Sequence, residues 1–441
     1  MSDFDLVIIG GGPAGLTAGL YAARANMNAV LLEAKDVGGE ILNTDLIEDW
    51  PGEESITGRA LADRMAGHAR KFGLRVETYA PVEKVRTEGD RKIITLADGT
   101  MHTALAVIVS VGGEPIKLGV PGEVEYHGRG VSYCAVCDGA FFKGADLAVV
   151  GGGDSAFQEG LFLTRFAKKL YVVHRRGEFR AQAILQDRLL GMDQVEMITP
   201  AQVREIGGNG DVKWIDVVRE GKLERVPVEG VFIFIGFKPV GRQLFEDHID
   251  HDPSGYLVTD QYMQTNIPGV YAVGDTRQQL AKQITTAVGD ATTAVLHAER
   301  YIEELKHAER AFPKAERAAV AEATRALRTL RVRAGQTVIR QGERGEDFFI
   351  VMRGTLEIVH TDVAGADKMV RTVGEGDSFG EIALLGDGTR TAAVRAVTDS
   401  EILVMGRDAF SRIVSSSPAA REEIEARAAE RIAELRGGGV R

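Results

Sequence analysis

The 441-residue chain contains only two cysteines, so at most one disulfide can form within it. No apolar run approaches the roughly 20 residues of a membrane-spanning helix, so we expect no membrane contact. Positive charge is in deficit, and the net charge of −11 disfavours nucleic acid or an anionic membrane surface as the main partner. The N-terminus has no basic start or cleavage site and runs directly into a strand. We therefore expect a cytoplasmic protein, whose thiols are kept reduced.

Glycine, in contrast, is abundant, with 52 residues that often cluster as tight turns opening helices. In the segment FDLVIIGGGPAGLTAGL, Gly10, Gly12 and Gly15 form a G-x-G-x-x-G pattern between a strand and a helix. This pattern lets a pyrophosphate approach the helix N-terminus. The next strand ends in Glu33, whose carboxylate suits a ribose diol and would repel a 2′-phosphate. The segment predicts FAD or NAD; a glycine-rich turn without a ligand is the alternative.

The pattern returns in DLAVVGGGDSAF as Gly151, Gly153 and Ala156. Here the following strand ends in a cluster of basic side chains, namely His174, Arg175, Arg176 and Arg180. Guanidinium groups at this place suit the 2′-phosphate of NADP, although a solvated basic face is the alternative. Two dinucleotide sites of opposite electrostatic preference indicate a flavoprotein that oxidises NADPH.

A third segment, NIPGVYAVGDTRQQLAKQIT, is a strand ending in Gly274 and Asp275, then a loop and a helix. Asp275 can accept hydrogen bonds from ribityl hydroxyls, and the helix N-terminus can stabilise negative charge on a reduced flavin. Because this segment follows the second fingerprint, we predict a discontinuous FAD domain. It comprises residues 1–113 and 243–305, and an NADPH domain of residues 114–242 is inserted in it.

Cys134 and Cys137 form a C-x-x-C in the inserted domain, for which we weighed three interpretations. A zinc site needs four ligands, and there is no second C-x-x-C and no His pair at metal-ligand spacing. A structural staple over two residues gains little stability, and the compartment is reducing. A redox disulfide is the favoured interpretation, with no metal. Asp138 is placed to shuttle a proton, and it is also a candidate cap for the helix that begins here.

On these residues and on further motifs in matching order, residues 1 to about 305 resemble the low-molecular-weight bacterial thioredoxin reductases. The further motifs are GGEILNT, IEDWPG, CAVCDGAFF, HRRGEFRA, VFIFIGFKP and VYAVGD. The resemblance implies an α/β fold with two Rossmann-like three-layer domains, a homodimer, and electron transfer from NADPH through FAD and the disulfide to thioredoxin. It implies that Cys137 faces the flavin as the charge-transfer thiolate, that Cys134 forms the mixed disulfide, and that Asp138 is the acid–base group. It also implies rotation of the inserted domain.

The predicted FAD contacts lie in the first fingerprint, the GGEILNT motif and the third segment. They are Gly10, Gly12, Pro13, Ala14, Gly15, Glu33, Gly39, Glu40, Asn43, Thr44, Gly274, Asp275, Lys282, Gln283 and Ile284. The predicted NADPH contacts are Gly151, Gly153, Asp154, Ser155, Ala156, His174, Arg175, Arg176, Arg180, Ile235 and Gly236. Three places depart from the common family pattern: Glu40 replaces a Gln, AKQIT replaces YRQAIT, and VSVGG replaces IATGA. Flavin potential and thioredoxin preference therefore stay open.

Residues 306–325 predict a helical linker interrupted near Pro313, either a plain spacer or a signal-transmitting arm. From residue 326 to 441, short alternating runs predict a small barrel or sandwich, and EEIEARAAERIAELR predicts one charged C-terminal helix. Only some thirty residues follow Phe410, so no helix-turn-helix fits there, which argues against a transcription factor.

Within this domain, GDSFGEIALLGDGTRTAAV places a Gly-Glu at the start of a short helix and an Arg nine positions on. Backbone N–H groups and a guanidinium suit a cyclic phosphate, while Glu381 suits a ribose 2′-hydroxyl. The stretch resembles the phosphate-binding cassette of cyclic-nucleotide-binding domains, which are jelly-roll β-barrels. The implied contacts are Phe379, Gly380, Glu381, Ile382, Ala383, Arg390, Thr391 and Ala392. We favour cAMP over cGMP, although Thr391 can bond guanine, and a domain that binds nothing is the alternative.

Together these observations predict an NADPH-dependent thioredoxin reductase regulated by cAMP or cGMP. One alternative is a nucleotide domain that only tethers or assembles the enzyme. Another is a reductase of a different disulfide protein.

Overall fold

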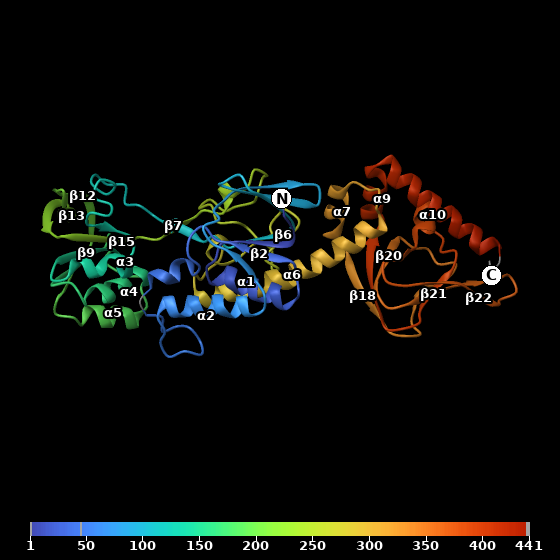
Figure 1. Cartoon of the computed structure of the whole chain (residues 1–441), viewed down its shortest axis with the longest axis horizontal. Helices are drawn as coiled ribbons and strands as arrows, with labels where there is room; N and C mark the ends of the chain where they lie inside the picture. Colours follow the sequence, from blue (N-terminus) through green and yellow to red (C-terminus); the bar gives the residue numbers. More distant parts are fainter. Residues whose placement is uncertain (1, 45, 438–441) are drawn as a thin grey trace.

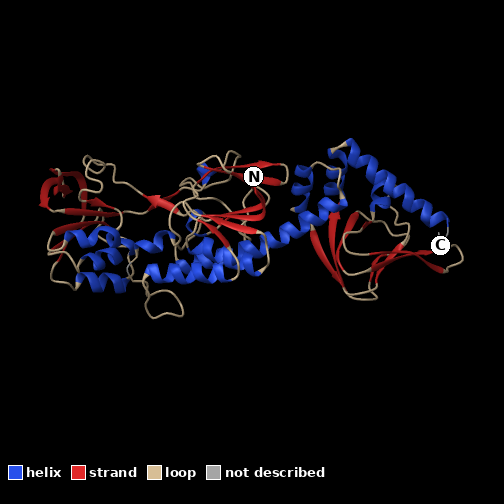
Figure 2. Ribbon diagram, in the orientation of Figure 1, coloured by secondary structure: helices blue, strands red, loops and turns tan. Residues whose placement is uncertain are grey.

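The computed structural model describes residues 2–44 and 46–437, and the last four residues of the predicted nucleotide domain lie outside them. The molecule is elongated, and three bodies follow one another along its long axis (Figure 1). The inserted segment forms one end, the body that contains the N-terminus lies in the middle, and the C-terminal body forms the other end. Helices lie mainly along one side of the two α/β bodies, and the C-terminal body consists mainly of strands (Figure 2).

The middle body is built on a seven-stranded sheet in the order β3-β2-β1-β6-β5-β4, with β17 also paired to β6. The strands are β1 (Ser2–Ile9), β2 (Ala29–Leu32), β3 (Arg75–Glu77), β4 (Val82–Glu88), β5 (Arg91–Leu96), β6 (Met101–Val109) and β17 (Val270–Ala272). Strands β1, β2, β3, β6 and β17 run parallel, and β4 and β5 extend β6 in antiparallel fashion. The inner halves of β1 and β6 are apolar throughout because they are buried on both faces.

Helices α1 (Pro13–Arg24), α2 (Gly58–Lys71) and α6 (Ile284–Ala311) belong to this body, together with the short 3-10 turns η1 (Gly39–Asn43) and η4 (Gly274–Thr276). Strand β17 follows the inserted segment in sequence but pairs with β6. The middle body is therefore made of two separate stretches of chain.

The inserted body has a five-stranded parallel sheet in the order β11-β10-β9-β15-β8 and a three-stranded antiparallel sheet, β12-β13-β14. Its strands are β8 (Val131–Ser132), β9 (Asp146–Gly151), β10 (Lys169–Val173), β11 (Val195–Ile198), β12 (Ala201–Asn209), β13 (Asp211–Arg219), β14 (Lys222–Pro227) and β15 (Gly230–Phe234). Its helices are α3 (Ala135–Asp138), η2 (Gly139–Phe142), α4 (Asp154–Leu163) and α5 (Ala183–Leu190).

Both chain crossings between these two bodies lie in one antiparallel ribbon, β7 (Gly113–Pro115) with β16 (Phe237–Pro239). After this ribbon the chain passes through η3 (Arg242–Leu244) and returns to the middle body. The covalent connection between the two bodies is therefore confined to one two-stranded ribbon.

The C-terminal body has two four-stranded antiparallel sheets, β18-β25-β20-β23 and β19-β24-β21-β22. The strands are β18 (Arg328–Val332), β19 (Thr337–Ile339), β20 (Asp347–Arg353), β21 (Leu356–Thr361), β22 (Asp367–Val373), β23 (Ser378–Phe379), β24 (Ala393–Ala396) and β25 (Ser400–Gly406). The helices are α8 (Glu381–Leu385), α9 (Arg407–Ser416) and α10 (Pro418–Gly437). The predicted all-β body, the short helix after the Gly-Glu pair and the C-terminal helix are therefore confirmed.

Helix α6 is shared by the middle and C-terminal bodies. Its first half lies in the apolar core with α1, and its last turn, with Phe312, lies in the same continuous core as Phe348 and Phe410. The helix ends at Ala311, two residues before Pro313, because proline has no N–H to donate and disfavours helix in the residue before it. A short helix, α7 (Arg317–Thr324), then leads into β18. The interruption that the sequence predicts lies at this point.

Among residues 2–44 and 46–437, no helix is both long and apolar enough to cross a membrane.

Candidate functional site

In each of the two glycine-rich turns, one glycine has free space where a side chain would lie. A Cβ at Gly10 would lie 2.5 Å from the carbonyl oxygen of Ser110, and one at Gly15 would overlap the carbonyl of Gly10, so chain packing alone explains these glycines. In contrast, a Cβ at Gly12 would meet no atom closer than 3.9 Å, and one at Gly153 would meet none within 4 Å. The protein itself does not require glycine there. Close approach of a pyrophosphate to the main chain would explain why both positions are glycine.

Three chain segments converge around the first turn. The N–H of Gly38 donates to the carbonyl of Gly11 at 2.8 Å, which places η1 beside the fingerprint. A Cβ at Gly274 would lie 3.2 Å from Ala14, which places η4 there as well. The predicted FAD residues on these segments are thus brought together at one edge of the sheet. Pro13 and Ala14 open α1, Gly39, Glu40 and Asn43 lie in η1, Thr44 follows η1, and Gly274 and Asp275 lie in η4.

Glu33 lies at the end of β2 and holds the fingerprint turn. Its Oε2 accepts from the N–H of Gly11 at 2.5 Å, and its Oε1 accepts from the N–H of Lys35 at 2.8 Å. Both carboxylate oxygens thus hold backbone N–H groups, and the ribose contact of Glu33 stays a prediction.

Two carboxyl groups, those of Glu40 and Asp275, face the same region. Burial raises the pKa of Glu40, while a hydrogen bond from Asn43 and the charge of Lys35 lower it and Asp275 raises it slightly. Burial also raises the pKa of Asp275, against the opposing charge of Lys282. Both residues are exposed, so their carboxyl groups are open to ribityl hydroxyls, which donate hydrogen bonds.

The last three predicted FAD residues lie where α6 begins. Lys282 donates through Nζ to the carbonyls of Arg277 at 2.7 Å and Asp275 at 3.2 Å and lies 4.0 Å from the ring of Tyr256. Gln283 and Thr286 form a capping box on α6, and Ile284 is the first residue of the helix. Lys282 and Gln283 therefore order the loop and the helix start beside Asp275.

Cys134 and Cys137 are joined as a disulfide, and this disulfide lies against η1 of the middle body. Oδ1 of Asn43 is 3.3 Å from Sγ of Cys134 and 3.7 Å from Sγ of Cys137. Cys137 is exposed and Cys134 is half-buried. The structure therefore places the sulfur pair of the inserted body at the edge where the predicted FAD residues converge.

The alternative role of Asp138 as a helix cap is wrong. Cys134 is extended and caps α3, with its Sγ accepting from the N–H of Cys137 at 3.1 Å. Asp138 is the last residue of α3 and caps nothing at the start of η2.

The second turn gathers the predicted NADPH residues. The N–H of Arg180 donates to the carbonyl of Gly152 at 2.7 Å, which brings the end of β10 over the fingerprint. Asp154 accepts from the N–H of Gln182 at 2.7 Å, Ser155 is exposed and Ala156 is buried. Ile235 and Gly236 follow β15, whose last carbonyl, that of Phe234, lies beside Gly151.

The basic cluster at the end of β10 is uncompensated. Arg175, Arg176 and Arg180 are exposed, and none forms an ion pair within the part of the chain that the structure describes. Burial and these three charges lower the pKa of His174. Three free guanidinium groups beside an open glycine turn have the charge and donors that suit a phosphate group.

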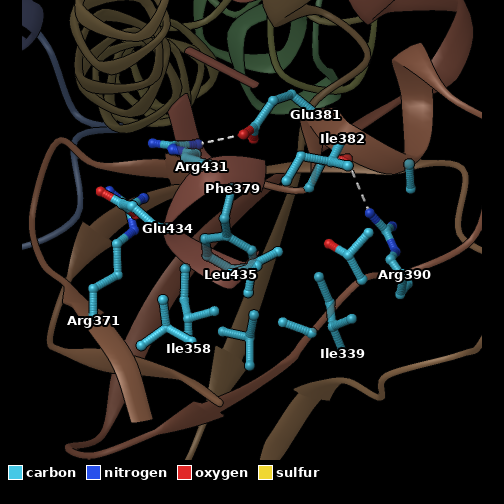
Figure 3. Close-up of a pocket in the computed structure, with 16 residues that line it drawn as sticks. Ile339, Ile358, Arg371, Phe379, Glu381, Ile382, Arg390, Arg431, Glu434 and Leu435 are labelled. Carbon is cyan, nitrogen blue, oxygen red and sulfur yellow. Dashed lines mark hydrogen bonds and ion pairs between the residues drawn. The ribbon is translucent and has the colours of Figure 1, made fainter. Parts of the chain in front are cut away.

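A pocket in the C-terminal body leaves about 500 Å³ free of protein atoms, and all eight predicted nucleotide residues line it (Figure 3). Arg390 is 6% exposed and donates to the carbonyls of Gly380 at 3.1 Å and Asp347 at 2.8 Å. Burial lowers the pKa of Arg390. Gly380 has a φ of +98°, which turns the chain sharply at the start of α8.

Glu381 is 1% exposed and pairs with Arg431 of α10, with Oε1 and Nη1 2.7 Å apart. Its other oxygen, Oε2, is buried and has no partner among the described residues. An unpartnered buried acceptor in a pocket is costly unless a ligand donates to it. The Oε2 atom is therefore where a ribose hydroxyl fits.

Sequence reasoning missed half of this pocket. The additional lining residues are Ile339, Ile358, Val370, Arg371, Val394, Arg431, Glu434 and Leu435. The three from α10 lie at i, i+3 and i+4, so they share one helix face. That spacing was visible in the sequence, but nothing in it shows that this face covers the pocket.

Comparison with known proteins divides the chain in the same way. Residues 4–291 match the family described as pyridine nucleotide-disulphide oxidoreductase, and residues 329–417 match the cyclic nucleotide-binding domain. The chain is 45% identical over 309 residues to the thioredoxin reductase of Listeria innocua, covering 69% of this chain and 96% of that protein. It is 44% identical over 307 residues to that of Bacillus subtilis, covering 69% and 96%.

Solved structures give a consistent result. The thioredoxin reductase of Lactococcus lactis is similar with a TM-score of 0.66 and 41% identity, over 68% of this chain and 99% of that one. The thioredoxin reductase of T. acidophilum is similar with a TM-score of 0.65 and 32% identity, again over 68% and 99%.

Proposed function

Because the chain belongs to the thioredoxin reductase family of pyridine nucleotide-disulphide oxidoreductases and carries a cyclic nucleotide-binding domain, we propose that it reduces thioredoxin with NADPH under control of a cyclic nucleotide. The observation that carries the proposal is the position of the Cys134–Cys137 disulfide against Asn43, at the edge where the FAD-site segments meet. A disulfide held there can exchange electrons with a flavin.

The chain's residues fit the two cofactors that the family implies. The open position at Gly12, the carboxylate of Glu33 and the exposed Asp275 suit the pyrophosphate, ribose and ribityl chain of FAD. The guanidinium groups of Arg175, Arg176 and Arg180 suit the 2′-phosphate of NADPH. Bound FAD supplies the two-electron carrier between NADPH and the disulfide.

The thiol steps follow from the two cysteines. Two electrons break the Cys134–Cys137 bond and leave a thiol and a thiolate. The Cys134 sulfur attacks the disulfide of thioredoxin, forming a mixed disulfide and displacing one thioredoxin thiolate. Cys137 then attacks Cys134, which releases reduced thioredoxin and restores the disulfide. Asp138 exchanges the protons with Cys137 and the leaving thiolate.

Thioredoxin needs access to Cys134, which is half-buried against the middle body. We propose that the inserted body swings about the β7–β16 ribbon between successive steps, as the family resemblance implies. An exposed ion pair between Arg188 and Glu48 joins the two bodies in the present arrangement. Such a pair contributes little stability and is easily exchanged for water.

For the C-terminal body, we propose that Arg390 binds the cyclic phosphate and that Oε2 of Glu381 accepts from the ribose 2′-hydroxyl. Arg431 orients Glu381 through Oε1. We favour cAMP and treat cGMP as the alternative, because a threonine at position 391 can bond guanine.

Regulation is supported by a short path from this pocket to the reductase. Arg427, one turn before Arg431 on α10, donates to the carbonyl of Ala311, the last residue of α6. Helix α6 has 28 residues, so it spans about 42 Å, and it begins beside Asp275. A movement of α10 on nucleotide binding would therefore act on the last residue of α6, and the first residues of the same helix lie at the flavin site.

The test is steady-state NADPH oxidation with the host's thioredoxin and with a chromogenic disulfide, titrated separately with cAMP and cGMP. A saturable rate change of ~5–150-fold with one nucleotide is the expected result. A rate indifferent to both nucleotides, with a change in oligomer size, would instead make the C-terminal body a tether. Activity with the chromogenic disulfide but none with thioredoxin would mean a different disulfide protein is the substrate.

A further inference from the structure

One buried threonine lies where the chain crosses between the middle and the inserted bodies. Thr276 is the last residue of η4 and is fully buried. Its Oγ1 accepts from the N–H of Gly112, the residue before β7, at 2.9 Å. Its methyl lies over Gly241, two residues after β16, where an added Cβ would be only 2.5 Å from Cγ2. Thr276 therefore contacts both Gly112 and Gly241, which we call the roots of the β7–β16 ribbon.

The ribbon begins directly at these roots. The carbonyl of Gly112 accepts from the N–H of Val240 at 3.4 Å. The next residue, Gly113, pairs with Pro239 at the end of the two strands. The two hydrogen bonds of Gly112 thus join Thr276 on one side to the ribbon on the other.

The turn that carries Thr276 is itself held in place. Asp290 of α6 is buried, accepts from the N–H of Gly274 at 3.1 Å and pairs with Arg277 at 3.2 Å. Gln279 donates to the carbonyl of Gly274 at 2.9 Å. The main chain of η4 is therefore fixed to α6, and Thr276 gives the ribbon a fixed point in the middle body.

The position of the disulfide depends on the roots of the ribbon. Both chain crossings lie in this ribbon, and Cys134 and Cys137 lie beyond it, with Asn43 3.3 and 3.7 Å from their sulfurs. A small turn at the roots displaces everything beyond them. Misplacing reacting groups by about 1 Å lowers a rate by up to about 10²-fold. A side chain that fixes the roots to η4, which also carries Asp275, therefore fixes the sulfurs relative to the flavin site.

We propose that Thr276 is a positioning residue, which holds both roots of the ribbon against η4 and so sets where the Cys134–Cys137 disulfide rests beside the flavin site. The proposal rests on the proposed function, because only a disulfide that must meet a flavin needs such precision. The hydroxyl holds Gly112 through a hydrogen bond, and the methyl fills the space beside Gly241. Valine keeps the shape of threonine without the hydroxyl, and serine keeps the hydroxyl without the methyl, so two substitutions separate the two contacts.

Hydrogen exchange followed by mass spectrometry tests the resting position of the disulfide without turnover. The oxidised holoenzyme is compared with its variants in two peptides, one with η1 and one with α3, which lie against each other. Amides that are protected where two bodies meet exchange faster when the bodies separate. Thr265→Val is the matched control, because this buried hydroxyl also accepts from a main-chain N–H, that of Ile267 at 3.2 Å, but bonds only within residues 265–270.

We expect Thr276→Val to speed exchange in both peptides about threefold to tenfold, and Thr276→Ser to lie between Thr276→Val and wild type. Gly241→Ala should act like Thr276→Val, because the new Cβ would push the Thr276 methyl away. Combining Gly241→Ala with Thr276→Ser should return exchange toward wild type, since the clashing methyl is gone. Thr265→Val should match wild type in both peptides.

Stopped-flow absorbance connects this position to the chemistry. One equivalent of NADPH bleaches the flavin absorbance, which returns as the two electrons pass to the disulfide. Thr276→Val should slow the return about threefold to tenfold per bound flavin, while FAD content and the rate of bleaching stay within about twofold of wild type. A substitution that only loosened the fold would lower FAD content or the melting temperature and leave the return per bound flavin unchanged.

Wild-type exchange in both peptides, together with a wild-type rate of return, in Thr276→Val would overturn the proposal. If Thr276→Val does not fold, wild-type exchange in Gly241→Ala would overturn it equally. The exchange measurement uses neither thioredoxin nor NADPH, so failure of the proposed substrate would leave this result interpretable.

Discussion

The carboxylate of Glu381 and the guanidinium of Arg431 form a buried ion pair, 2.7 Å apart, between the nucleotide pocket and the last helix. The pair joins residues fifty positions apart in sequence. It leaves Oε2 of Glu381 as the unpartnered acceptor in the pocket.

Arg431→Gln should weaken cAMP binding about tenfold, or about 1.4 kcal/mol, because Glu381 would lose the buried charged partner that orients it. Isothermal titration calorimetry of the full chain measures this. Arg421→Gln, an exposed change on the same helix, is the matched control. Equal affinity in Arg431→Gln and wild type would show that the ion pair does not prepare the site.

Arg427→Ala should remove most of the nucleotide effect on turnover while nucleotide affinity stays within about threefold. Arg427 does not line the pocket, but it holds the last carbonyl of α6. Rate and affinity are measured on the same preparation. An unaltered rate response would mean that coupling does not pass through this contact.

Arg175→Ala combined with Arg176→Ala should raise the KM for NADPH about 10–100-fold and leave the KM for NADH nearly unchanged. Each lost charge-assisted hydrogen bond costs roughly 1.5–3 kcal/mol, and only NADPH carries the 2′-phosphate. Arg204→Ala, an exposed change in the same body, serves as control. A parallel rise for both nucleotides would place the phosphate elsewhere.

Cys134→Ser should abolish turnover with thioredoxin, because the nucleophile that attacks its disulfide is lost, while NADPH still bleaches the flavin absorbance. Stopped-flow spectroscopy follows the bleaching, and a coupled assay follows turnover. If Cys134→Ser kept its thioredoxin activity, the roles assigned to the two sulfurs would be wrong.

Glu309→Gln should raise the melting temperature at pH 8 and leave it unchanged near pH 5. Burial and the Asp90 carboxyl raise the pKa of Glu309 to about 7, whereas an unfolded Glu titrates near 4.3. The folded chain therefore holds a proton that the unfolded chain releases, and stability falls as the pH rises from about 4.5 to 7.

The neighbouring charges do not change this sign, since Arg91 and Arg317 lie 3.2 and 3.6 Å from the buried Asp90 carboxyl and stabilise that group. Differential scanning fluorimetry across this range measures the effect, with the surface change Glu430→Gln as control. A wild-type melting temperature that rises through the same window would contradict the raised pKa of Glu309.

Features carried by one short segment were predictable from the sequence. The glycine turns, the cysteine pair, the basic cluster after β10 and the Gly-Glu helix with Arg390 each have a local pattern set by backbone geometry or charge. The residue that caps α3 was not predictable in this way. Helix α3 begins one residue after Cys134, so Asp138 lies at its end and not at its start.

Contacts between distant segments were not predictable either. Asn43 meets Cys134 across 91 residues, and Arg431 meets Glu381 across 50. No periodicity or propensity encodes such pairs, since they depend on how complete bodies pack. The sharing of α6 between two bodies was hidden for the same reason, because the helix looked like the end of one domain followed by a linker.

Helix α6 has no midpoint at which the chain can be divided. A fragment ending near residue 305 would keep the contacts of α6 with α1 but lose Ala308, Ala311 and Phe312, which are buried in the described structure. The complementary fragment would keep Phe312, on which Phe348 and Phe410 pack, but would lose most of α6, the helix that holds Phe312 in place. Neither fragment would contain a complete hydrophobic core. The reductase and the nucleotide domain should therefore be expressed, purified and engineered as one chain.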